Sequence, residues 1–131
     1  MNEQRLKQEV ELVRSHFPST DPHHSRSWIL ITDWQIPEAT WKCTSVNLCI
    51  RIPDNYPGQA PYAFYVQPFD LKLKDGSNPN NAQLVSDTVY GGTWLKFSWA
   101  AENWSPDADI NRGSNLLNFL NSIRTRFAEG K

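Results

Sequence analysis

Apolar residues near the start of the chain recur every three or four positions, and charged or polar residues fill most positions between them. This spacing is typical of an amphipathic helix that buries one face. It predicts a helix over about residues 2–17, which ends before Pro18 because proline disfavours the helical conformation in the preceding residue. The polar residues 19–26 predict a loop. The apolar positions of the helix are Leu6, Val10, Val13 and Phe17.

Three further stretches have the composition or the alternation of β-strands. Residues 28–36 are rich in aromatic and β-branched residues and end before Pro37, and residues 41–52 alternate between two faces as a half-buried antiparallel strand does. The third strand is predicted over residues 63–68, with residues 69–73 as a candidate extension. The apolar face of the second strand carries Thr44, Val46, Leu48, Ile50 and Ile52. Its less apolar face carries Cys43, Ser45, Asn47, Cys49 and Arg51.

Residues 55–61, which we call the proline corner, lie between the second and third predicted strands. Pro57 and Pro61 lack a backbone N–H and fix φ near about −65°, so the strand before them cannot continue its hydrogen-bond ladder. A stiff segment of this kind needs contacts to neighbours, and Tyr56 and Tyr62 are the natural anchors. The sequence therefore predicts a rigid turn at this point.

Turn-forming residues crowd the next part of the chain, and about residues 74–108 are predicted to be irregular. A loop of this length in a compact domain is usually functional. Within it, residues 93–99 alternate briefly, as a short strand does. The last periodic stretch predicts a helix over about residues 110–128, with Asp107 or Asp109 as its N-cap.

The order of these elements predicts the fold class. One helix, a meander over about residues 27–68, the irregular segment and a last helix indicate an α+β fold in which helices pack on an antiparallel sheet. A chain of 131 residues fits a single domain, residues 1–131, without a metal or disulfide to stabilise it.

Charge and hydropathy limit the classes of partner and compartment. The formal net charge is −1, so nucleic acid and anionic membrane are poor candidates for the main partner. No apolar run approaches the roughly 20 residues of a membrane span, and the N-terminus lacks the pattern of a signal peptide, so a cytoplasmic protein is expected. Cys43 and Cys49 are six positions apart in one predicted strand, about 20 Å, which is too far for a disulfide between them.

Two motifs resemble those of a known superfamily. The proline corner followed later by a Trp-Ser-Pro segment resembles the ubiquitin-conjugating-enzyme (UBC) fold, whereas the corner alone also occurs in the related RWD domains. These motif residues are Tyr56, Pro57, Pro61, Trp104, Ser105 and Pro106. Over roughly residues 27–128 the chain more closely resembles the bacterial family-E branch, which accompanies prokaryotic ubiquitin-like conjugation systems. The further matching positions are Gly58, Phe64, Tyr65, Val66, Pro68, Asp75, Gly76, Gly92, Trp94 and Asp109.

The resemblance implies a nucleophile position that this chain does not fill with cysteine. In active UBC proteins a cysteine between the two motifs accepts the modifier as a thioester. Here that position falls on Trp94 or, counting back from Trp104, on Lys96, and no cysteine follows Cys49. Neither tryptophan nor lysine forms a thioester. The His-Pro-Asn element of the family, whose Asn steadies the oxyanion, has only a faint counterpart that ends at Asn80.

Other candidate chemistry has weaker support. Cys43 or Cys49 is an alternative nucleophile, although an inert strand cysteine explains each of them more simply. The adjacent His23 and His24 are better explained by a solvated loop than by a metal site, so we predict no metal site. Large side chains near the vacant nucleophile position are candidates for partner binding as well as for core packing. The candidate partner-binding residues are Trp94, Trp99 and Asn80.

Together these observations favour a catalytically inactive UBC-like protein that acts as a binding or adaptor subunit in a bacterial ubiquitin-like conjugation pathway. The expected partners are the ubiquitin-like modifier, the activating enzyme or an active conjugating enzyme, and no cofactor is expected. Two alternatives remain open: an active transferase with a relocated nucleophile, and an RWD-like protein-interaction module.

Overall fold

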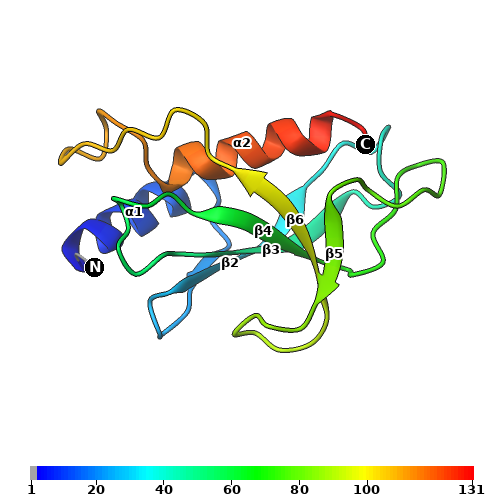
Figure 1. Ribbon diagram of the computed structural model, residues 1–131, viewed down its shortest axis with the longest axis horizontal. Helices are drawn as coiled ribbons and strands as arrows, with labels where there is room; N and C mark the ends of the chain where they lie inside the picture. Colours follow the sequence, from blue (N-terminus) through cyan, green and yellow to red (C-terminus); the bar gives the residue numbers. More distant parts are fainter. Residues whose placement is uncertain (1–2) are drawn as a thin grey trace.

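The computed structural model describes residues 3–131 as a six-stranded antiparallel sheet with one helix at each end of the chain (Figure 1). The predicted α+β class is confirmed. None of the helices in residues 3–131 is long and apolar enough to cross a membrane. The elements are α1 (Glu3–His16), β1 (Thr20–Pro22), β2 (Trp28–Gln35), β3 (Ser45–Arg51), β4 (Tyr62–Gln67), β5 (Ala82–Val85), β6 (Trp94–Ala100) and α2 (Leu116–Ala128).

The strand order in the sheet is β1-β2-β3-β4-β6-β5. The first four strands form a meander, β6 pairs with β4, and β5 lies at the edge beyond β6 (Figure 1). The register places Leu48 opposite Val66 and Tyr65 opposite both Cys49 and Lys96. Residues on the third, fourth and sixth strands are therefore direct neighbours on each face of the sheet.

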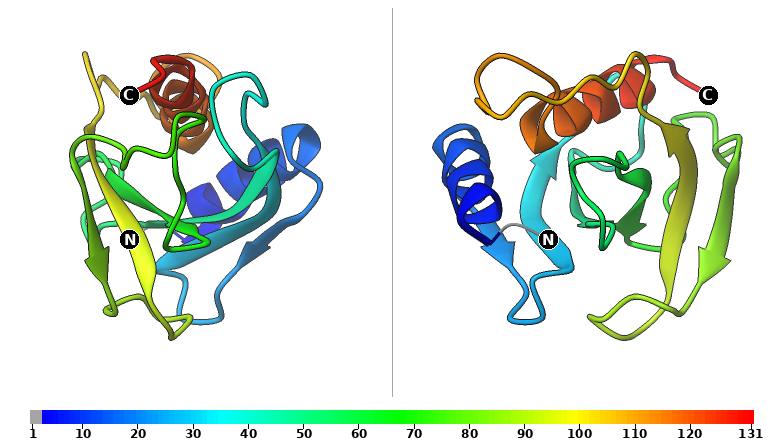
Figure 2. Two further views of the ribbon diagram at one scale, coloured as in Figure 1. Left: turned by 90° about the vertical axis from the view of Figure 1, so that its right-hand side faces the viewer. Right: turned by 60° about the vertical axis from the view of Figure 1, so that its left-hand side comes forward.

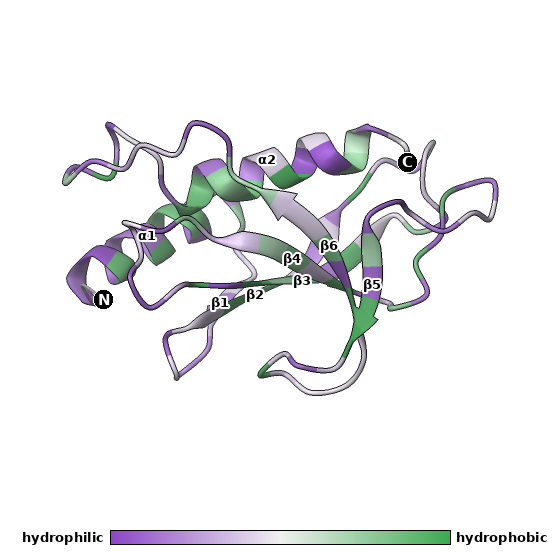
Figure 3. Cartoon of the chain, viewed as in Figure 1, coloured by the Kyte–Doolittle hydropathy of each residue, from purple (hydrophilic) through white to green (hydrophobic). Residues whose placement is uncertain are grey.

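The helix face of the sheet, defined by Ile29, Leu48 and Phe64, holds the main core. Both helices contribute buried side chains to this core and contact each other (Figures 1 and 2). Phe64 stacks on Phe97 with 4.8 Å between ring centroids, and Phe127 of α2 contacts both rings. Figure 3 shows apolar residues concentrated in the central strands and interleaved with polar residues along the helices. The alternation in the sequence thus produces the burial of one sheet face.

The opposite side, which we call the open face, carries a second and smaller cluster. Trp28, Cys49, Tyr65 and Trp94 are buried there, and Leu30, Val85 and Tyr90 pack against them. The loop between β5 and β6 supplies Tyr90, whose ring lies 6.2 Å from that of Trp94. Cys49 therefore lies on the face opposite the main core, as predicted, but this face is not accessible at Cys49, because the cluster covers it.

Two strands lie where the sequence predicts loop or irregular chain. Residues 20–22 form β1, which pairs with β2 at one sheet edge and ends at Pro22. Residues 82–85 form β5 at the other edge, where Leu84 is exposed. Short edge strands bury too few side chains to produce a clear alternation, so their sequences lack the pattern of strands.

The boundaries of three predicted elements also differ. The strand predicted over residues 41–52 corresponds to β3, which begins only at Ser45. Trp41 forms an isolated bridge with Leu73. Residues 69–73 do not extend β4, since the chain turns after Pro68 with a hydrogen bond from Leu71 N to its carbonyl. The last helix begins at Leu116, so neither predicted aspartate caps it.

The N-cap of α2 is Asn115, whose side chain accepts a hydrogen bond from Asn118 N at 2.9 Å. The Asn118 side chain in turn accepts from Asn115 N at 3.0 Å, which completes a capping box. Asp107 and Asp109 instead accept hydrogen bonds from backbone N–H groups two residues later. These aspartates stabilise the turns before the helix rather than the helix itself.

Candidate functional site

Tyr56 anchors the proline corner in the interior of the protein. Its side chain is 3% exposed, its N–H donates to the Pro53 carbonyl, and the Tyr56–Pro57 peptide bond is cis. The corner ends at Pro61, immediately before β4. Of the two predicted anchors, Tyr56 is therefore confirmed as buried, whereas the prediction for Tyr62 is wrong, because its side chain is 56% exposed.

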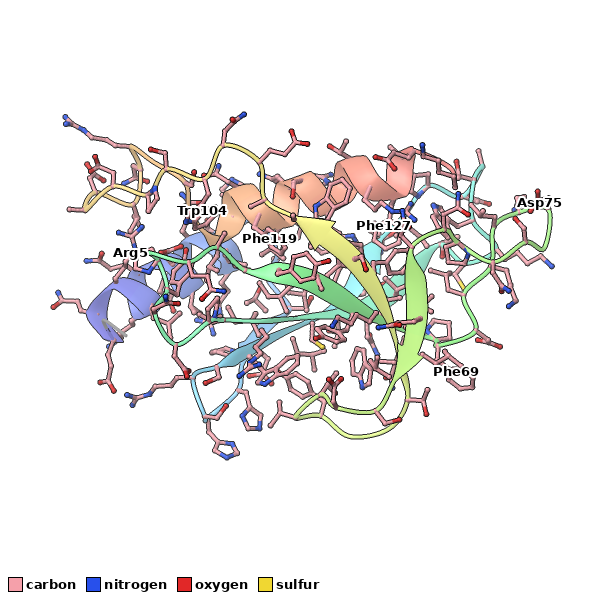
Figure 4. The ribbon with its side chains drawn as sticks, viewed as in Figure 1. Arg5, Phe69, Asp75, Trp104, Phe119 and Phe127 are labelled. Atoms are coloured by element: carbon pink, nitrogen blue, oxygen red, sulfur yellow. The ribbon has the colours of Figure 1, made fainter. Side chains whose placement is uncertain are left out.

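The Trp-Ser-Pro segment, residues 104–106, lies directly against this corner. Trp104 Nε1 donates to the Pro57 carbonyl at 2.8 Å, and its ring lies 5.9 Å from that of Tyr56. Ser105 exchanges hydrogen bonds with Ser114, just before α2. Two motifs nearly fifty residues apart in the sequence therefore meet at one end of the sheet, beside the start of α2 (Figure 4).

A buried carboxylate joins this corner to both helices. Glu9 of α1 is 0% exposed and accepts hydrogen bonds from Arg5 Nε at 2.8 Å, Tyr56 Oη at 2.6 Å and Leu116 N at 2.7 Å. Burial, followed by the hydrogen bond to Glu9, raises the pKa of the Tyr56 phenol well above its usual range. The Arg5 side chain also donates to the Asp107 carbonyl (Figure 4). The sequence gives no local indication that Glu9 is buried, because it lies in the charged pattern of an ordinary helix.

The two residues at the predicted nucleophile position lie on the open face of β6. Trp94 is 2% exposed and donates from Nε1 to the Gly91 carbonyl at 2.8 Å, so its ring belongs to the open-face cluster. This burial speaks against Trp94 as a partner contact. Lys96 is half-buried, and its Nζ lies 5.8 Å from the ring centroid of Tyr65.

The two cysteines occupy different environments. A groove lies beside the proline corner, and neither cysteine lines it. Cys49 is completely buried, and burial together with the negative charge of Asp87 raises the pKa of its thiol. Cys43 is partly exposed and packs against the main core, just before β3. A thiolate nucleophile needs access and a lowered pKa, and Cys49 has neither.

The other candidate partner-binding residues, Trp99 and Asn80, lie on the α2 side of β5 and β6. Trp99 is half-buried and donates from Nε1 to Ser122 Oγ at 2.9 Å. Asn80 is exposed, and its carbonyl accepts a hydrogen bond from the buried Arg126 at 2.8 Å. The structure does not bring these two residues into the groove beside the proline corner.

That groove, the corner groove, is a cavity of about 420 Å³ between the corner and the open face. Arg51, Tyr62, Tyr65 and Lys96 line it from the sheet, and the other side is lined by Pro53, Asp54, Asn55, Gln59 and Ala60. Arg51 was visible in the sequence only as a polar position of an alternating strand, whereas Lys96 was a candidate for the nucleophile position. Their convergence depends on the pairing of β4 with both β3 and β6, which sequence spacing does not reveal.

Two further observations concern ligands. Within residues 3–131 no three His, Cys, Asp or Glu side chains are arranged to hold a metal ion. His23 and His24 have ring centroids 4.1 Å apart, and His23 Nδ1 lies 2.8 Å from Ser25 Oγ. A larger cavity of about 520 Å³, between the end of α1, β2 and α2, contains none of the predicted site residues.

An α+β chain whose proline corner contacts a Trp-Ser-Pro segment has the architecture of an E2-like protein. The family model for Prokaryotic E2 family E matches residues 10–127, which is most of the chain. The chain belongs to this family, and its membership supports a role related to bacterial ubiquitin-like conjugation. No curated protein and no solved structure matched the chain.

Proposed function

We propose that this member of the family is catalytically inactive and acts as a binding or adaptor subunit in a ubiquitin-like conjugation pathway. The proposal is supported by the burial of Trp94 and by Lys96 over the Tyr65 ring, the two residues that the resemblance aligns with the cysteine of active relatives. Neither side chain accepts a modifier as a thioester.

The environments of the two cysteines support the same proposal. A relocated nucleophile would need an accessible thiolate near the corner groove, where the modifier of an active relative would be held. Cys49 is sealed beneath aromatic rings on the open face, and its thiol pKa is raised. Cys43 packs against the opposite, helix-face core. Thioester formation at Cys49 would require the residues that cover it to move, and Cys43 does not line the corner groove.

The intact contact between the proline corner and Trp104 favours binding over loss of all function. This contact and the Glu9 network stabilise the proline corner, and no cysteine lines the corner groove beside it. A groove beside a rigid corner and without a cysteine suits a protein that holds or orients a partner. The candidate partners are the modifier, the activating enzyme and an active conjugating enzyme.

The test is to incubate the protein with ATP and with its cognate modifier and activating enzyme. We expect no adduct that dithiothreitol removes, and we expect capture of at least one of these proteins without ATP. A reducible adduct that disappears in Cys43→Ser or Cys49→Ser would refute inactivity. Failure to capture any pathway protein would instead favour the RWD-like alternative, an interaction module outside the pathway.

A further inference from the structure

The two edges of the sheet differ in how they are protected against pairing with another strand. β1 is 3 residues long, carries Asp21 and ends at Pro22, which has no N–H to donate. β5 forms the other edge, beyond β6, and its residues Ala82–Val85 include neither a proline nor a charged side chain (Figure 2). Within residues 3–131 no strand pairs with the outer side of β5. This edge is therefore open to an additional strand.

The ladder with β6 determines which backbone groups of β5 face outward. The Asn81 carbonyl accepts a hydrogen bond from Ser98 N at 2.9 Å, so Asn81 belongs to a hydrogen-bonded pair. Such pairs alternate with non-hydrogen-bonded pairs along an antiparallel ladder, and Gln83 therefore also bonds to β6. Ala82 and Leu84 instead direct their N–H and carbonyl groups to the outer side of the sheet. Both residues can therefore donate to and accept from a further strand.

Apolar side chains gather beside this edge, on the helix face of the sheet. Leu84 lies opposite Leu95 of the main core, but its own side chain is 60% exposed. Phe69 is 49% exposed, and it lines a hollow of about 320 Å³ together with Ala82 and Leu84 (Figure 4). The apolar surface of the helix face thus extends to the edge of the sheet, and residues 3–131 leave its last part exposed.

The charges around β5 are compatible with a second copy of the same chain. Where two identical strands pair about a two-fold axis, a residue near the axis lies close to its own counterpart, so like charges there repel each other. Residues 78–86 carry no charged side chain. Self-pairing of β1 would instead bring two Asp21 carboxylates together. Charge therefore permits self-pairing at β5 and opposes it at β1.

We propose that the protein forms a symmetric dimer in which β5 pairs with β5 of a second copy, so that the two sheets become one. A two-fold axis at Gln83 places Ala82 opposite Leu84 of the other copy, and the outward N–H and carbonyl groups of both residues then form the hydrogen bonds. Each Leu84 side chain packs beside Ala82 of the other copy, at the hollow that Phe69 lines. This inference goes beyond the proposed function and does not depend on it.

The short length of β5 limits the strength of such a dimer. A stable interface buries about 1,600 Å² in total, and strands of 4 residues with one hollow in each copy should bury less. We therefore expect a dissociation constant in the micromolar range. Analytical ultracentrifugation of the full chain between about 1 and 500 μM covers this range. The sedimentation coefficient should rise with concentration from that of a monomer toward that of a dimer.

A charge introduced at the edge tests whether β5 is the contact. Leu84→Lys should raise the dissociation constant about tenfold or more, because it removes the apolar contact and places like charges near the axis. Val89→Lys is the matched control, since it introduces the same charge at an exposed apolar residue outside β5. Thermal unfolding of both variants checks that the monomer is folded.

A cysteine at the proposed axis tests the register of the two strands. Directly opposite residues of an antiparallel pair have Cβ atoms about 4.5–5.5 Å apart, so Gln83→Cys should form an intermolecular disulfide when oxidised with diamide. The substitution is made together with Cys43→Ser, which removes the partly exposed thiol and leaves the buried Cys49. Gln59→Cys in the same background is the control, because Gln59 is also exposed but lies in the proline corner.

A monomer at every concentration would overturn the proposal and would leave the β5 edge to a strand of a different protein. A dimer that Leu84→Lys weakens no more than Val89→Lys would also overturn it, because β5 would then not be the contact. Cross-linking of Gln59→Cys as fast as Gln83→Cys would contradict the symmetric register. A dimer that Leu84→Lys disrupts and that Gln83→Cys links covalently would support both the contact and its register.

Discussion

Replacing Glu9 by alanine should destabilise the protein more than any exposed substitution in α1. The Glu9 carboxylate is fully buried and accepts from the Arg5 side chain, from the Tyr56 hydroxyl and from Leu116 N. Its removal leaves two buried donors without their acceptor and deprives Arg5 of this carboxylate. Breaking a buried charged network by removing one member costs about 3–5 kcal/mol, a large part of the about 5–15 kcal/mol typical of a whole domain.

Urea unfolding followed by tryptophan fluorescence measures this loss as a difference in the free energy of unfolding. Glu11→Ala is the matched control, because Glu11 lies on the same helix and its ion pair with Arg14 is exposed. We expect the control to change the free energy by less than about 0.5 kcal/mol. A loss below about 1 kcal/mol in Glu9→Ala would refute the argument that this carboxylate fixes the corner and both helices.

A double-mutant cycle isolates the contact that reaches the corner. Tyr56→Phe removes only the hydroxyl, and a hydrogen bond to a charged group contributes about 1.5–3 kcal/mol. In Glu9→Ala the same hydroxyl already lacks its acceptor, so the second substitution should cost less there, and the coupling energy should exceed about 0.5 kcal/mol. Additive losses would mean that the two side chains act independently.

Three further outcomes follow from the buried groups. Burial raises the pKa of Tyr56 and Tyr90, so the folded state keeps both phenol protons at a pH where the unfolded chain has lost them. The free energy of unfolding should therefore fall above about pH 10, by up to about 1.4 kcal/mol per pH unit for each tyrosine. A free energy of unfolding that stays constant above this pH would contradict the burial. In native protein Ellman's reagent should modify Cys43 and leave Cys49 unmodified until urea is added, and equal rates would contradict its burial. Gly113→Ala should lower the free energy of unfolding, measured by thermal unfolding, by about 1–3 kcal/mol, because the new Cβ would lie 2.6 Å from two backbone atoms. Ser114→Ala is the control, since it removes a nearby hydrogen bond without introducing this clash.

The sequence predicted those parts of the fold that bury enough residues to impose a period. Apolar residues three or four positions apart predicted the first helix, and apolar residues two positions apart predicted the central strands. The side of β3 that faces the main core was also assigned correctly, through Val46, Leu48 and Ile50. The edge strands β1 and β5 were missed, since a strand with one neighbour has little to bury. The periodicity of one strand does not show whether residues from other segments cover its second face. The open-face cluster, and with it the burial of Cys49, was therefore not predicted.

The candidate site was predictable to a lesser degree, for a related reason. The two motifs were found because each is contiguous in sequence, and the structure joins them through Trp104 and Pro57. The corner groove is assembled from Arg51, Tyr65 and Lys96 on three strands, and their proximity depends on pairing partners far apart in the chain. A motif can therefore identify the neighbourhood of such a site, while the residues that line the groove lie outside the motif.

The contacts that stabilise the corner are separate from the residues at the nucleophile position. Glu9, Tyr56, Leu116 and Trp104 form one set of buried hydrogen bonds, and none of these bonds involves residues 94–96. Trp94 instead packs in the open-face cluster, and Lys96 lies over Tyr65. The hydrogen bonds that fix the corner are therefore independent of the side chains of Trp94 and Lys96. A substitution at Lys96 should leave the corner intact, so its effect on the proposed function can be tested apart from its effect on the fold.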